Sequence, residues 1–249
     1  MDVRVQGAGP TEPFLSARDL FETEYDLDRP VSVYLREDPD ERTYTSHDAD
    51  GHDLSISRQA ASSAMARELA LHEFSHMHRN EQGHPSHTQS TEEALYLALS
   101  GRSVERRKLT HCYQIANHMK DIYADDLTLS VAPADKLVAF LESSLAAALA
   151  DRPAALPAGT RLTAAADPEI TAVNAAFALA LVERHGLVGT DHRLYDLAHA
   201  AAEDAPEIRF DRFKERFRSL ADDPGESEYR KILVDVTREY AIGGQQAAD

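Results

Sequence analysis

RELALHEFSHMH, residues Arg67–His78, is the stretch that decides how this chain is expected to fold. His72 and His76 stand four residues apart, so on a helix they share one face, with Cβ atoms about 5–6 Å apart. That spacing lets two imidazole nitrogens reach one tetrahedral Zn²⁺. Glu73 is turned aside from both histidines and can therefore reach a metal-bound water without binding the ion. The stretch predicts a metal-binding helix that carries its own general base.

Apolar residues upstream place the histidine pair on the inward face of that helix. Ala61, Met65 and Leu69 recur at helical spacing and lead directly to His72 and His76. A buried imidazole needs a partner, and one shared metal ion satisfies both rings. We therefore interpret the pair as ligands rather than as incidental helix histidines.

Composition and charge limit the classes of partner. The chain has 249 residues, of which 43% are hydrophobic, enough to bury a substantial core. Its formal net charge is -17, and only five of its 26 basic residues are lysine. Such a halophilic surface is typical of salt-loving organisms, because dissolved salt screens its self-repulsion. The sequence has no basic stripe of the kind that a nucleic-acid backbone requires, so no nucleic-acid partner is expected.

Features bearing on the compartment favour the cytoplasm. The start, MDVRVQGAGPTEPF, lacks the basic and apolar pattern of a secretory signal, and no apolar run approaches the length of a membrane span. Cys112 is the single cysteine, which excludes an internal disulfide and fits a reducing compartment. We expect a cytoplasmic protein that has no membrane partner.

Short strands are expected before the metal helix. After a flexible opening, Phe14–Glu24 suits a short helix. Three segments alternate as strands do: Val31–Glu37, Thr43–Ser46 and Asp53–Ser57. Ser57 suits the N-cap of a helix from Arg58 to about Asn80. We predict an α+β fold in which a small antiparallel sheet packs on the metal helix.

The rest of the chain is expected to be mostly helical. Helices are predicted over Thr91–Leu99, Val104–Asp126, Asp135–Ala150, Pro168–His185, Arg193–Glu203, Ile208–Leu220 and Glu228–Ile242. Asp151–Asp167 contains prolines and a glycine and is the best linker candidate. This predicts a metal-binding domain over residues 1–150 and a helical subdomain over residues 151–249.

A catalytic zinc site needs a third protein ligand and leaves its fourth position to water. Asn117, Asp121 and Asp125 stand four residues apart on one face of a predicted helix. We predict Asp121 as the third ligand. Asp125 would then hold the outer nitrogen of a ligand histidine, with Asn117 nearby.

Other residues compete for the third position. Glu93, on the helix after the polar loop Gly83–Ser90, is the alternative ligand. His84, His87 and His118 could also bind the metal. We expect them instead to be surface groups or to support the ligands, because they lie in polar sequence or off the Asp121 face. The aspartates would also suit a solvated helix face in so acidic a protein.

The motif HEFSH (His72–His76) and the downstream Asp121 and Asp125 resemble the zincin metallopeptidases, in particular small gluzincin-like members. The resemblance covers about Val31–Leu129. It implies strands, an active-site helix, and a second helix that brings the acidic ligand. Asp at position 121 departs from the usual Glu, and Gln82 stands where metzincins place a third histidine. The chain also resembles a family of salt-loving archaea to which no function is attached.

Peptide-bond hydrolysis is the leading hypothesis. Zn²⁺ on His72, His76 and Asp121 would lower the pKa of a bound water, and Glu73 would take its proton and later pass it to the leaving amine.

The expected substrate is a peptide or protein lying antiparallel to an edge strand, either Val31–Glu37 or Asp53–Ser57. The oxyanion donor stays open between Tyr123 and His118.

Two alternatives remain on sequence grounds. In one, the zinc is structural and stabilises a regulatory module whose helical C-terminal half binds a protein partner. In the other, a zinc hydrolase acts on a carbonyl compound that is not a peptide. Glu73 favours a hydrolase, since a structural site has no need for a base.

Overall fold

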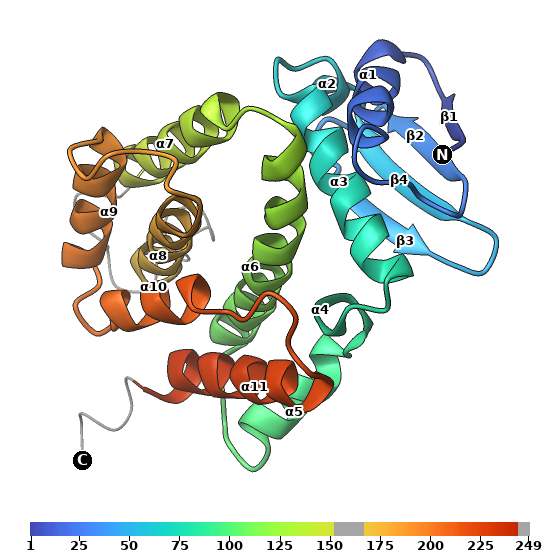
Figure 1. Ribbon diagram of the computed structural model, residues 1–249. Coiled ribbons are helices and arrows are strands. Elements are labelled where there is room, and N and C mark those ends of the chain that lie inside the picture. The colour runs from blue at the N-terminus through green and yellow to red at the C-terminus, as the bar shows by residue number, and fades with distance from the viewer. Residues whose placement is uncertain (152–166, 244–249) are drawn as a thin grey trace. The chain divides into compact units, whose positions relative to one another are not determined.

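The computed structural model describes residues 1–151 and 167–243, which form two compact units. Unit 1 comprises Met1–Thr88 and Lys120–Lys136, and unit 2 comprises Gln89–Met119 and the described part of Leu137–Asp249. Figure 1 shows the elements of both units. All three ligand residues predicted from the sequence belong to unit 1.

Unit 1 contains one four-stranded sheet in the order β1-β2-β4-β3. The strands are β1 (Val3–Gln6), β2 (Val31–Arg36), β3 (Tyr44–His47) and β4 (His52–Ser57). β2 pairs in parallel with β1 and β4, whereas β3 pairs antiparallel with β4. The predicted α+β class is confirmed, but the expected antiparallel sheet is wrong, because the sheet is mixed. α1 (Glu12–Phe21) supplies the crossover that the parallel pair β1–β2 requires.

The core of unit 1 lies between the sheet and two helices, α1 and α3 (Ala66–Glu81). Phe14 and Phe21 of α1, Phe74 of α3 and Leu54 of β4 are all fully buried in it. These side chains belong to the apolar faces that the helix and strand periodicities present. Their packing holds α3, and with it the HEFSH motif, firmly on the sheet.

The helix expected from Arg58 to Asn80 is in fact two helices, α2 (Arg58–Ala61) and α3. The Ser57 side chain caps α2 as predicted, by accepting a hydrogen bond from the Ala60 N–H. The Ser63 hydroxyl accepts one from the Met65 N–H, a local bond that competes with helix continuation. The interruption falls before the motif, so both histidines lie inside α3.

α6 (Arg106–Val131) is one continuous helix. Its C-terminal part, from Lys120, belongs to unit 1. α4 (Pro85–Thr88) is a single helical turn within the expected polar loop.

Unit 2 is helical throughout its described residues, which confirms the predicted helical C-terminal half. Besides the first part of α6, it contains α5 (Thr91–Leu99), most of α7 (Asp135–Ala150), α8 (Pro168–His185), α9 (Arg193–Glu203), α10 (Phe210–Arg218) and α11 (Glu226–Ile242). α8 is buried along most of its length and packs against α9 and α10. It is capped by the Asp167 side chain and ended by Gly186, whose φ of 60° is left-handed.

The two units are divided differently from the two predicted domains, since α5 and part of α6 belong to unit 2. A domain boundary at residue 150 stays a prediction. Residues 152–166 of the expected linker lie outside the described part of the chain. No helix in the described ranges combines the length and the apolar character that crossing a membrane takes.

Candidate metal centre

Two helices of unit 1 bring three potential ligand atoms together. The Nε2 atoms of His72 and His76, both on α3, lie 3.0 Å apart. Asp121 Oδ1, on α6, lies 3.7 Å from His72 Nε2 and 3.4 Å from His76 Nε2. Within the described residues, this is the group of His, Cys, Asp and Glu side chains whose ligand atoms all lie within 4.8 Å of one another.

The spacing of these three atoms fits a tetrahedral zinc ion. Zinc bonds of about 2.0–2.1 Å place tetrahedral ligands roughly 3.3 Å apart. The measured separations of 3.0, 3.4 and 3.7 Å bracket that value. A circle through the three atoms has a radius of about 2.0 Å, close to one zinc–ligand bond. The short aspartate side chain therefore reaches far enough, because α6 approaches α3 closely at Asp121.

The outer nitrogen of His72 is held by a buried carboxylate. His72 Nδ1 lies 2.8 Å from Oδ1 of Asp125, which is 3% exposed. An ionised carboxylate only accepts hydrogen bonds, so Nδ1 carries a hydrogen, and in the neutral ring Nε2 is left with a lone pair that faces the other ligand atoms. Asp125 thus occupies the supporting position predicted for it, one helical turn beyond Asp121.

The outer nitrogen of His76 begins a chain of hydrogen bonds through α4. His76 Nδ1 lies 2.7 Å from His87 Nε2, and His87 Nδ1 lies 2.7 Å from Ser86 Oγ. Ser86 Oγ in turn lies 2.6 Å from His84 Nδ1. The sequence left His84 and His87 as either surface groups or supports of the ligands, because they lie in polar loop sequence. Their i, i+3 spacing across one helical turn was the available signal.

One contact determines which group donates in each of the hydrogen bonds that link His76, His87, Ser86 and His84. The Ser86 backbone N–H donates to His84 Nδ1, so that nitrogen is an acceptor. The Ser86 hydroxyl must then donate to it and accept from the Nδ1–H of His87. His87 Nε2 consequently accepts from the Nδ1–H of His76. The Nε2 of His76 is therefore also left with a lone pair that faces the ligand group.

When both imidazoles are neutral, three acceptors converge on one point, and their mutual repulsion favours a bound cation. The raised pKa of His72 also indicates that positive charge is favoured at this position. Burial disfavours its charged ring, but attraction to Asp125, together with hydrogen bonds to Asp121 and Asp125, raises the pKa of His72 well above its usual value. A divalent metal ion would supply that positive charge in place of a proton and leave both imidazoles neutral.

Glu73 lies beside the first ligand and is only 8% exposed. Within the described ranges, its carboxylate takes part in no hydrogen bond or ion pair. Its oxygen atoms are not among the fully buried side-chain atoms that lack a partner, so water can reach the carboxylate. A largely buried glutamate whose oxygen atoms stay available to water suits a general base.

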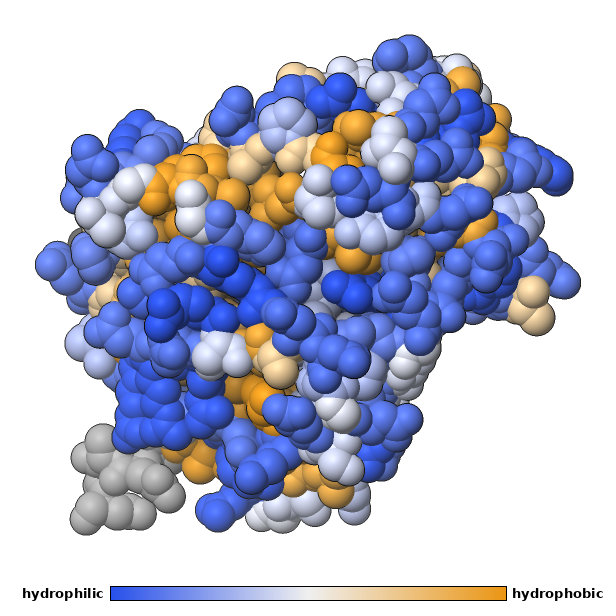
Figure 2. All heavy atoms as spheres, in the orientation of Figure 1, coloured by the Kyte–Doolittle hydropathy of each residue, from blue (hydrophilic) through white to orange (hydrophobic). Residues whose placement is uncertain are grey.

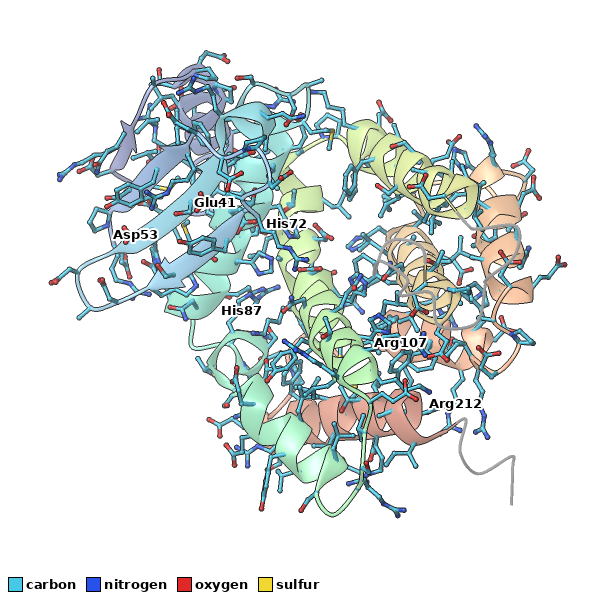
Figure 3. The ribbon with its side chains drawn as sticks, turned by 180° about the vertical axis from the view of Figure 1, so that it is seen from behind. Glu41, Asp53, His72, His87, Arg107 and Arg212 are labelled. Carbon is cyan, nitrogen blue, oxygen red and sulfur yellow. The ribbon has the colours of Figure 1, made fainter. Side chains whose placement is uncertain are left out.

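The other candidates lie elsewhere. Glu93 is an exposed residue of α5, and Asn117 is an exposed residue of α6; both belong to unit 2, and neither joins the ligand group. His118 Nε2 lies 2.8 Å from Asn174 Oδ1, and its ring stacks on Phe177 within unit 2. The structure brings Asp121 to the histidine pair, and not Glu93. Figure 3 labels His72 on α3 and His87 on α4.

Tyr123 is fully buried, with its ring centroid 4.5 Å from that of His84. It therefore packs against the far end of the hydrogen-bond chain. Neither Tyr123 nor His118 is assigned as the oxyanion donor.

The edge strand nearest to the metal helix is β3. The strands expected to receive a substrate, Val31–Glu37 and Asp53–Ser57, correspond to β2 and β4, which are interior strands, so that expectation is wrong. β3 packs against α3. Burial, followed by the charges of His52, Arg29 and His76, lowers the pKa of His47 at the end of β3 to about 4.

Comparison with known proteins yields one family. A family model described as a family of unknown function (DUF5781) matches residues 1–242. Neither the curated proteins nor the solved structures provide a match. None of these comparisons attaches a reaction or a substrate to the chain.

Proposed function

We propose that the chain, which belongs to the family of unknown function DUF5781, is a zinc-dependent hydrolase and in particular a metallopeptidase. One observation carries the proposal. The lone pairs of His72 and His76 and the carboxylate of Asp121 converge at zinc spacing, next to a buried glutamate that has no partner among the described residues.

The ligand set favours zinc over harder cations. Two imidazole nitrogens with one carboxylate form a typical catalytic zinc set, whereas calcium and magnesium prefer oxygen ligands throughout. When bound, zinc supplies Lewis-acid polarisation of a carbonyl and lowers the pKa of a water ligand toward neutrality. His72, His76 and Asp121 are all partly exposed, so a water or a substrate has access to the fourth position.

The chain's own residues divide the remaining work. Glu73 accepts a proton from the attacking water and later delivers it to the leaving amine. Asp125 and His87 hold the two imidazoles in the tautomers that metal binding requires. The hydrogen bonds that link His87, Ser86 and His84 orient the second ligand through a neutral acceptor, whereas a carboxylate orients the first.

A peptide substrate fits the sheet edge beside the motif. β3 ends the sheet on the side of its antiparallel pairing with β4, so its outer backbone groups can bind an extended chain. This arrangement favours a peptide over a small carbonyl compound. A cytoplasmic location suits Cys112, which is free and buried.

Glu73→Gln separates catalysis from metal binding. The variant keeps the shape of the side chain and removes the base, so we expect peptide hydrolysis to fall roughly 10²–10⁴-fold at unchanged zinc content. Cleavage of a mixed-sequence peptide library in high salt, with metal analysis of the same sample, measures both. Glu93→Gln, at an exposed position of α5, is the matched control and should retain activity.

Full activity of zinc-loaded Glu73→Gln would contradict the proposed mechanism. Wild-type protein that binds zinc, unfolds on its removal and cleaves no peptide would identify the zinc as structural instead.

A further inference from the structure

A pocket of about 390 Å³ in unit 2 gathers positive charge. Five arginines line it: Arg102 after α5, Arg209 at the start of α10, Arg212 and Arg216 within α10, and Arg238 on α11. Figure 3 labels Arg212, and a strongly hydrophilic patch lies at the lower left of Figure 2 over the ends of α10 and α11. The arginines come from segments more than a hundred positions apart in the sequence.

The charge of this pocket opposes that of the whole chain. Two acidic residues, Asp235 and Glu239, line it beside the five arginines, so its formal charge is +3. The chain as a whole carries -17, with 43 acidic residues against 26 basic ones. In so acidic a protein a guanidinium readily meets a carboxylate, and a local excess of arginine therefore requires a cause.

Three of the guanidiniums are held in place by the fold. Arg212 Nε and an amino group of Arg216 lie 3.0 and 3.1 Å from the same oxygen of Glu239. Arg238 donates to the backbone carbonyls of Leu97 and Ala98. These bonds join α10, α11 and the end of α5 into a fixed wall.

The other two guanidiniums have no such bonds. The side chains of Arg102 and Arg209 are exposed and, in the part of the chain that the structure describes, form no hydrogen bond or ion pair. Each presents a planar set of donors that matches two oxygens of a phosphate group. Their donors remain available at the mouth of a pocket whose wall is already positive.

We propose that this pocket binds a small phosphorylated molecule carrying at least two negative charges. Its volume of about 390 Å³ lies within the usual range for small-molecule sites, and its lining is rich in the side chain best suited to phosphate. The arginines surround a hollow and do not form a stripe, and the rest of the chain is strongly acidic. A nucleic-acid strand, which needs an extended basic track, is therefore disfavoured. The site lies in unit 2 and does not depend on the proposed hydrolase.

Titration calorimetry with inorganic pyrophosphate tests this proposal. We expect pyrophosphate to bind at least tenfold more tightly than inorganic phosphate or sulfate at equal ionic strength, because its two anionic groups can engage separate guanidiniums. Binding should weaken at least tenfold in the double variant Arg102→Gln, Arg209→Gln. Neither side chain has a partner to lose among the described residues, so the variant should fold normally.

Two control variants establish whether pyrophosphate binds at the pocket itself. Arg106→Gln removes an exposed arginine of α6 that lies outside the pocket, and it should leave binding unchanged. Asp121→Ala removes a predicted metal ligand and should also leave it unchanged, which excludes chelation by pyrophosphate. Equal weak binding of all three anions, unaltered binding by the double variant, or tighter binding of a single-stranded oligonucleotide would each overturn the proposal.

Discussion

The candidate metal centre of unit 1 and the arginine pocket of unit 2 have opposite chemistry but a similar construction. In the candidate metal centre, acceptor atoms of His72, His76 and Asp121 lie close together. In the pocket, the guanidinium groups of five arginines lie close together. Neither arrangement is favourable by itself, since like groups repel. In both regions the accumulation is best explained by a ligand of the opposite character.

The two regions differ in how many of their side chains are fixed by hydrogen bonds. At the metal centre the outer nitrogens of both histidines are bonded, one to Asp125 and the other to His87. In the pocket, Arg102 and Arg209 have no partner among the described residues. A pre-organised site loses less conformational entropy on binding. We therefore expect tight, geometrically selective metal binding in unit 1 and weaker anion binding in unit 2.

His72→Ala should produce the largest effect and separate the regions most clearly. Removal of a direct ligand should weaken zinc binding by more than about 100-fold. This is a larger loss than the roughly 10- to 100-fold expected for a supporting residue. Pyrophosphate binding should not change, since the pocket is built from unit 2. Competition with a chromophoric chelator measures the first and calorimetry the second. A parallel loss of both would mean that the two sites are not independent.

Asp125→Ala should weaken zinc binding by roughly 10- to 100-fold, because it removes the acceptor that orients His72. Asp125→Asn keeps an oxygen at that position and should restore part of the affinity. If Asp125→Ala binds zinc as the wild type does, the buried carboxylate does not position the ligand.

His87→Phe tests the second support and should have a smaller effect, roughly threefold to tenfold in zinc affinity, since His87 is a neutral acceptor and weaker than a carboxylate. It leaves the Nδ1–H of His76 without its acceptor. His87→Gln offers an oxygen there and should recover most of the affinity. The visible spectrum of the cobalt-substituted protein should change in His87→Phe and return toward wild type in His87→Gln. An unchanged spectrum in His87→Phe would contradict a role for the hydrogen-bond chain.

The smallest effect concerns acid stability at the sheet edge. The pKa of His47 is about 4 in the folded protein, below the ordinary value of 6.5, so between these values the unfolded chain binds more protons. Stability should therefore fall as the pH drops from 6.5 to 4. His47→Asn should flatten this slope in denaturant titrations. An identical slope in both proteins would show that another group governs the acid response of unit 1.

The sequence could predict which side chains form the candidate metal centre, because residues at a four-residue spacing on one helix share a face. His72 and His76 share one helix, as do Asp121 and Asp125, and a four-residue spacing assigns each pair to a face. The same periodicity located the helices of unit 2. Local spacing could not decide between Asp121 and Glu93 as the third ligand, because that depends on how closely α6 approaches α3.

Features that depend on distant pairing could not be predicted in this way. β1 lies in the segment that the sequence predicts to be a flexible opening, and β2 pairs in parallel with both β1 and β4, an order that alternation within a single strand does not encode. The arginine pocket left no signal, because Arg102, Arg209 and Arg238 are scattered along the chain and only the packing of helices brings them together.

The zinc content of Asp121→Ala, measured beside wild type and Glu93→Ala, tests the central claim most directly. We predict about one zinc per chain in the wild type and in Glu93→Ala, and a large loss in Asp121→Ala. If Asp121→Ala holds zinc as tightly as the wild type, the convergence of α3 and α6 at this residue is not a metal centre.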